Sequence, residues 1–126
     1  MLGQIAAETA TRFGARPVVV DPAGTLTYAE LDERAEELAA GLALRGVGDG
    51  DVVAVALPSG GEWLVAAVAL ARVGAVIAGV STAITPAERR ELVALVRPKL
   101  VLAAPTTVDG LPLRSEVAVL SPGARG

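Results

Sequence analysis

The side chains that most often do chemistry in enzymes are scarce in this chain of 126 residues, which contains no histidine and no cysteine. Without cysteine there is no thiol nucleophile, no disulfide and no cysteine-based zinc or iron–sulfur site. Without histidine the commonest general base and the commonest metal ligand are both missing. We therefore assign no catalytic residue and no metal ligand to this chain.

Two groups of charged residues could still suggest a site. Five acids gather in one stretch, but a solvated helix face explains them better than paired catalytic carboxylates, since Glu30 and Arg34 stand at i, i+4. The only lysine, Lys99, follows Pro98 at the start of an apolar run, and we expect it to point to water. The acids are Glu30, Asp32, Glu33, Glu36 and Glu37.

Two glycine motifs could bring a backbone close to a phosphate. Gly46-x-Gly48-x-Gly50 follows an expected helix and precedes an expected strand, which is the reverse of a dinucleotide-binding turn, so we interpret it as a helix C-cap and turn. Ser59-Gly-Gly61 follows a strand and precedes a helix, where ligands often bind in α/β sheets. A plain helix start is the better interpretation there too, because no Gly-Lys-Ser/Thr follows.

The composition is that of one α/β domain. Hydrophobic residues make up 52% of the chain and aromatic residues 2%, so the core has to be built from Ala, Val and Leu. The formal net charge is -3 and both signs are interspersed, which argues against nucleic-acid binding. Since Met1 to Phe13 has no basic start and favours a short helix over a signal peptide, we expect a cytoplasmic location.

The elements that would position any site are two capped helices and three buried strands, preceded by a hairpin. Pro17 to Asp21 and Leu26-Thr27 flank a turn and indicate a short hairpin. Capping boxes at Thr27 to Glu30 and Thr85 to Glu88 each begin a helix. Three apolar, β-branched runs, typical of parallel strands buried on both faces, are Val52 to Leu57, Val76 to Val80 and Lys99 to Ala103. The order predicts an α/β fold with a parallel sheet of at least three strands and flanking helices.

The helix expected over Glu62 to Val73 is apolar around its whole circumference. Trp63 to Val80 is long enough to span a membrane, but Arg72 near its middle and the helix stop Gly74 argue against a span. A helix with no polar face needs cover on both sides. The two amphipathic helices need their single apolar stripes for the sheet, so we expect the isolated chain to form a homo-oligomer through this helix.

Six phrases occur in an order and spacing similar to those of AMP-forming, adenylate-forming ligases, which include acyl-CoA synthetases and peptide-synthetase adenylation domains. The resemblance covers about Ala10 to Ala103. It implies that residues 1–126 are a single N-terminal subdomain of a larger ligase, with 105–126 an irregular tail apart from a possible strand over Val117 to Leu120. The phrases are Leu26-Thr-Tyr-Ala-Glu-Leu31, Gly46 to Leu57, Leu57 to Trp63, Ala71 to Val76, Thr85-Pro-Ala-Glu88 and Arg97-Pro-Lys-Leu-Val101.

In that family these phrases are scaffold, and the residues that perform adenylation come later. The resemblance thus implies an acyl-CoA synthetase that uses ATP, magnesium and CoA, none of them held by this chain, with the remainder of the ligase as its partner. Two details depart from the family: Ser81-Thr82 replaces Asn-Pro, and the helix after the third strand is shortened to Thr106 to Arg114.

The family also suggests one binding hypothesis, since the helix that begins at Thr85 lies near the mouth of the CoA channel in acyl-CoA synthetases. Arg89 and Arg90 on that helix could meet CoA phosphates in the parent, although a solvated face is the simpler explanation. Two other functions stay open. The chain could be a fragment of a peptide-synthetase adenylation domain, although the phrases Thr85 to Glu88 and Arg97 to Leu102 favour a CoA ligase. It could also be a stand-alone α/β binding module.

Overall fold

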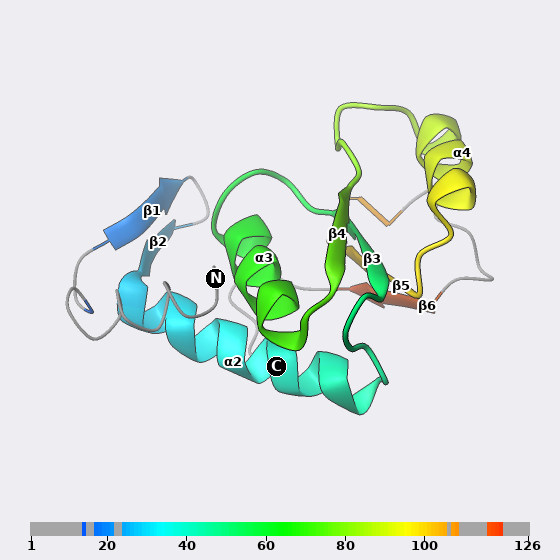
Figure 1. Ribbon diagram of the computed structural model, residues 1–126. Helices are drawn as coiled ribbons and strands as arrows, with labels where there is room; N and C mark the ends of the chain where they lie inside the picture. Colours follow the sequence, from blue (N-terminus) through cyan, green and yellow to red (C-terminus); the bar gives the residue numbers. More distant parts are fainter. Residues whose placement is uncertain (1–13, 15–16, 22–23, 106, 109–115, 120–126) are drawn as a thin grey trace.

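A four-stranded parallel sheet forms the centre of the molecule in the computed structural model, which describes residues 14, 17–21, 24–105, 107–108 and 116–119 (Figure 1). The strand order is β4-β3-β5-β6, and each neighbouring pair is parallel. The strands are β3 (Val52–Ala56), β4 (Val76–Gly79), β5 (Leu100–Ala103) and β6 (Glu116–Val119). The three strands expected from apolar runs are confirmed, and a fourth forms within 105–126, where the sequence allowed one.

A separate antiparallel pair precedes the sheet, as expected for a hairpin. Strand β1 (Pro17–Asp21) pairs with β2 (Gly24–Thr27), and Figure 1 shows the pair beside the start of the first described helix. The short helix expected within Met1 to Phe13 and most of the one expected over Thr106 to Arg114 lie outside the described residues.

Helices cover both faces of the sheet. They are α2 (Tyr28–Leu44), α3 (Gly61–Val73) and α4 (Pro86–Val96). Side chains alternate along the strands, so Val53, Val55, Leu100 and Leu102 join the core that contains α2 and α3, while the small Ala54, Ala56 and Ala103 pack with Val93 of α4. The larger core therefore lies on the α3 side.

Both capping boxes form as the sequence predicts. Thr27 N–H donates to Glu30 Oε1 at 2.9 Å, and Glu30 N–H donates to Thr27 Oγ1 at 3.2 Å. The corresponding bonds between Thr85 and Glu88 are 3.2 and 3.1 Å long. These bonds satisfy backbone donors of the first turn that have no intrahelical acceptor, and so fix where α2 and α4 begin.

The side of α3 that faces away from the sheet is covered within the chain, which differs from the sequence-based expectation. All residues from Val65 to Leu70 are buried, and the apolar stripe of α2 packs against α3 in the same core. That stripe consists of Leu31, Ala35, Leu38, Ala39 and Leu42. The assumption that α2 needs its stripe for the sheet was wrong, and the argument for self-association through α3 loses its basis, because α2 itself supplies the second layer.

Ion pairs across the α2–α3 contact fix how the two helices lie. Arg34 of α2 pairs with Glu62 at the start of α3, and Arg72 at the end of α3 pairs with Asp32. Arg72 Nη1 also donates to the Asp32 carbonyl at 3.0 Å and lies 3.2 Å from Glu36 Oε2. A cation from each helix thus meets an anion of the other, and because both ends of α3 pair with the same short stretch of α2, the two helices cross rather than run side by side.

The apolar stretch from Trp63 to Val80 divides into a helix, a turn and a strand. Helix α3 ends at Val73, Gly74 adopts a left-handed φ of 77°, and β4 begins at Val76. Among the residues that the structure describes, no helix is both long and apolar enough to cross a membrane.

Candidate functional site

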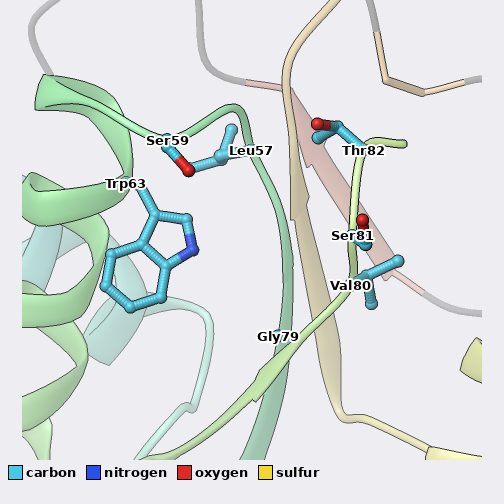
Figure 2. Close-up of a pocket in the computed structure, with 7 residues that line it drawn as sticks. All are labelled: Leu57, Ser59, Trp63, Gly79, Val80, Ser81 and Thr82. Carbon is cyan, nitrogen blue, oxygen red and sulfur yellow. The ribbon is translucent and has the colours of Figure 1, made fainter. Parts of the chain in front are cut away.

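A pocket of about 200 Å³ opens at the carboxyl ends of β3 and β4, which is the edge where parallel α/β sheets usually bind ligands. Figure 2 shows Trp63 of α3 on one side and the segment after β4, with Ser81 and Thr82, on the other. The lining residues are Leu57, Ser59, Trp63, Gly79, Val80, Ser81 and Thr82. The pocket therefore includes the start of Ser59-Gly-Gly61 and the Ser81-Thr82 pair that departs from the family phrase.

The local backbone explains how Ser59 reaches this pocket. Strand β3 ends at Ala56, and Gly60, with φ 136°, is the N-cap of α3 and makes no side-chain cap bond. Helix α3 begins directly after this motif, as expected, and the preference for a plain helix start over a phosphate-binding turn stays a prediction. Only glycine adopts this backbone conformation without strain, so the turn from β3 into α3 depends on Gly60.

The chemistry available in this pocket is limited to hydrogen bonding and apolar contact. Three hydroxyl groups and one indole N–H line it, and no ionisable side chain is among the lining residues. Such a surface can orient a ligand through hydrogen bonds and apolar contacts, and none of these lining side chains is a general acid or base near neutral pH.

The carboxyl ends of β3 and β5 are joined by Thr107, a residue that the sequence analysis missed. Thr107 is buried, and its Oγ1 donates to the Ala56 carbonyl and accepts the N–H of Ala104 at 2.9 Å. The bond from Ala104 N–H to a hydroxyl three residues later closes a local turn, and a threonine at that position is a sequence signal for it. No local signal identifies Ala56 as the second partner, because it lies 51 positions away.

The two arginines proposed for CoA binding lie in different environments. Arg89 is buried, and its Nη1 donates to the Thr107 carbonyl at 3.2 Å, whereas Arg90 is exposed. The structure does not bring their side chains together on one surface. Arg90 is therefore on a solvated face, whereas Arg89 is not. A role in binding CoA phosphates stays a prediction for both residues.

The turn from Gly46 to Asp51 is a helix C-cap, as interpreted from the sequence. Gly46 has φ 83°, its N–H donates to the Ala43 carbonyl at 3.0 Å, and Val47 N–H donates to the Leu42 carbonyl at 3.0 Å. This bond pattern is the Schellman motif, and Val47 packs in the same core as Leu42. The glycines therefore end α2.

Lys99 is tied to this turn, contrary to our expectation that it would simply point to water. Its Nζ donates to the Gly46 carbonyl at 2.6 Å and lies 3.3 Å from Asp51 Oδ2. Asp51 Oδ2 also accepts the Gly48 N–H at 2.8 Å. The Gly48 N–H, and after it the Lys99 ammonium, lower the pKa of the Asp51 carboxyl below its usual value of 3.8.

The part of the chain that the structure describes has no set of side chains that fits a bound magnesium nucleotide. The described residues contain no group of three or more His, Cys, Asp or Glu side chains that could hold a metal ion. The sequence also has no Ser/Thr/Gly-rich loop ending in lysine, since Lys99 follows Arg97-Pro98. We therefore derive no chemical step through such a group in this chain.

The parallel sheet, its flanking helices and a carboxyl-edge pocket whose lining has no ionisable side chain define part of an α/β domain. The sequence matches the family described as AMP-binding enzyme over residues 6–123, which is most of the chain. The chain belongs to this family.

Relatives in the family include peptide synthases and CoA ligases. The chain is 41% identical over 105 residues to the isonitrile lipopeptide synthase of Streptomyces coeruleorubidus, and 32% identical over 104 residues to the 4-coumarate–CoA ligase CCL1 of Humulus lupulus. These matches cover 82% and 81% of this chain but only 7% and 19% of the relatives. The chain therefore spans a small part of the length of these relatives.

Solved structures agree on the fold. A benzoate CoA ligase from Burkholderia xenovorans LB400 matches 98% of this chain with a TM-score of 0.86 and 21% identity, and the match covers 26% of that chain. The nonribosomal peptide synthetase FmoA3 matches 99% with a TM-score of 0.85 and 26% identity, over 13% of its own chain. The expected fold, the N-terminal subdomain of adenylate-forming ligases, is confirmed.

Proposed function

We propose that this chain is the N-terminal scaffold of a larger ATP-dependent acyl-CoA synthetase and does not catalyse on its own. The observation that carries the proposal is the match of the whole described fold to one part of adenylate-forming enzymes, in a chain without histidine, cysteine or a phosphate-binding loop. Membership of the AMP-binding enzyme family supports the reaction class. We place the parent in the cytoplasm and in the metabolism of fatty acids or other carboxylates.

The proposed parent reaction has two steps. A carboxylate oxygen attacks the α-phosphate of ATP and releases pyrophosphate, and the thiol of CoA then displaces AMP from the acyl group. ATP, magnesium and CoA would be held by the remainder of the ligase. This chain would supply the sheet and the pocket wall formed by Trp63, Ser81 and Thr82. Arg89 and Arg90 remain the candidates for a CoA phosphate, and Arg90 is the exposed one of the two.

A peptide-synthetase adenylation domain is the main alternative. The 41% identity to a lipopeptide synthase supports it, whereas the phrases Thr85-Pro-Ala-Glu88 and Arg97-Pro-Lys-Leu-Val101 favour a CoA ligase. A stand-alone α/β binding module is the third possibility. Sequencing the reading frame past Gly126 distinguishes the binding module from the two ligases, because both ligases need a phosphate-binding loop downstream.

A direct measurement tests the proposed lack of activity. The purified chain should show only background carboxylate-dependent exchange of labelled pyrophosphate into ATP with any acid, because the groups that bind the triphosphate are missing. A full-length member of the family serves as the positive control. Clear exchange by pure material would contradict the scaffold assignment.

A further inference from the structure

Among the residues that the structure describes, only two polar side chains are buried, and they belong to residues in contact with each other. Arg89 of α4 is 8% exposed and Thr107 is 3% exposed. Arg89 Nη1 donates to the Thr107 carbonyl at 3.2 Å. A guanidinium that loses its water is stable only where hydrogen bonds take the place of that water. The bond to Thr107 is therefore one of those that keep the Arg89 charge buried.

Thr107 carries this contact from α4 into the sheet. Its Oγ1 donates to the Ala56 carbonyl at the end of β3 and accepts the N–H of Ala104, directly after β5, at 2.9 Å. Its own N–H donates to the Ala104 carbonyl at 2.9 Å. Strands β3 and β5 are neighbours in the sheet, so one residue ties α4 to the carboxyl ends of two adjacent strands.

This network adjoins both walls of the carboxyl-edge pocket. One wall begins at Leu57, which directly follows Ala56 (Figure 2). The opposite wall, Val80 to Thr82, lies in the segment that leads from β4 into α4. Val80 packs in the same core cluster as Ala56 and Val93 of α4. A shift of α4 or of the end of β3 would therefore change the width of the pocket.

Apolar packing holds α4 less firmly than it holds the other two helices. Helix α4 has two buried residues, Arg89 and Val93, whereas α2 has five and α3 has six. Apolar contact is non-directional, whereas a hydrogen bond requires a defined distance and angle. The bond from Arg89 to the Thr107 carbonyl therefore restricts the position of α4 in a way that Val93 alone does not.

We propose that Arg89 and Thr107 are positioning residues, which together hold the two walls of the carboxyl-edge pocket at a fixed separation. Neither residue lines the pocket, so both act through the segments they hold, Leu57 on one side and Val80 to Thr82 on the other. This role needs no contact with a ligand and so differs from the phosphate contact predicted for Arg89. It is independent of the ligase function proposed above.

Fluorescence of Trp63 tests the proposal, because it is the single tryptophan of the chain and lines the pocket. Arg89→Met keeps most of the aliphatic stem and removes the guanidinium, and Thr107→Val keeps the size of the side chain and removes the hydroxyl. Both should increase the quenching of Trp63 by acrylamide and shift its emission to the red, because the walls separate and admit water. Thr107→Ser retains the hydroxyl and should match the wild type.

Val93→Ala is the matched control on the same helix. It removes buried apolar contact, which lowers the free energy of unfolding, and leaves the bonds of Arg89 and Thr107 in place. Quenching of Trp63 in folded Val93→Ala should therefore equal that of the wild type.

Circular dichroism and urea unfolding establish that each variant is folded under the conditions of the quenching measurement. Unchanged quenching in folded Arg89→Met and Thr107→Val would overturn the proposal. So would an equal increase in Val93→Ala, because any loss of stability would then widen the pocket, or an increase in Thr107→Ser as large as that in Thr107→Val. Loss of the fold in both Arg89→Met and Thr107→Val would overturn it as well, because the network would then be required for folding and not for the position of the walls.

Discussion

At the scale of single residues, Gly74 in the turn after α3 meets a specific backbone demand. Gly74 ends α3 in the left-handed region, and its carbonyl accepts the N–H of Gly50 at 2.9 Å. A Cβ on Gly74 would collide with Asp49 Oδ1 and lie 3.3 Å from Asp49 Cα. The turns after α2 and α3 therefore pack directly on each other, and glycine is needed for both conformation and space.

Replacing Gly74 by Ala should lower the free energy of unfolding by about 1–3 kcal/mol, through left-handed strain and displacement of Asp49. Gly41→Ala is the matched control. Gly41 lies inside α2, where a Cβ would meet no atom within 4 Å, so alanine should raise stability by roughly 0.5–1 kcal/mol. Urea unfolding of both variants measures the difference. Equal effects of the two substitutions would contradict the packing of the two turns.

The turn that contains Asp51 should make stability depend on pH in the acid range. Hydrogen bonding by Gly48 and Lys99 lowers the folded pKa of Asp51, so the unfolded chain binds this proton more tightly. The contribution is complete above 3.8, the usual value for Asp, and is lost as the pH falls through the lowered folded pKa.

Thermal unfolding of the wild type and Asp51→Asn, from neutral pH down to about pH 2.5, measures this contribution. The wild type should be the more stable above the usual pKa, and the gap should close as the pH falls below it. Lys99→Met removes the second donor and should reproduce part of the effect. A gap that stays constant across the range would show that the Asp51 charge contributes nothing.

At the scale of elements, the contact between α2 and α3 decides how the apolar helix is accommodated. The interior of this contact is aliphatic, and the ion pairs Arg34–Glu62 and Arg72–Asp32 lie at the two ends of α3. The side chains of Arg34 and Glu62 are 15% and 21% exposed. Partial burial weakens solvent screening, so this pair should contribute more than an ordinary surface pair.

A double-mutant cycle with Arg34→Ala and Glu62→Ala should give a coupling free energy of about 1 kcal/mol. The matched pair is Arg72 and Glu36, which lie 3.2 Å apart with Glu36 77% exposed, and its coupling should be below about 0.5 kcal/mol. Both cycles use chemical unfolding at low and high salt. A larger coupling for the exposed pair would contradict the view that burial, and not ion-pair number, strengthens this contact.

At the scale of the whole molecule, the two faces of the sheet are covered unequally. The α3 face has two helical layers, whereas the described part of the α4 face has one helix, whose Leu95 is 81% exposed. With 2% aromatic residues the core depends on close packing of small side chains such as Ala54 and Ala56. Among the residues that the structure describes, the α4 face is therefore the more thinly covered side of the sheet.

The sequence by itself determined the features that depend on neighbouring residues. The capping boxes at Thr27 and Thr85, the turn at Gly46 and the buried strand from Val52 are local, because their partners lie a few positions away or follow from periodicity. The family phrases added the ligase class. Only the tertiary structure decided that α2 covers α3, that Lys99 binds the turn at Gly46 and that Thr107 joins Ala56. Those partners lie tens of residues apart, and pairing at such distances is set by how the layers pack, which no local pattern encodes.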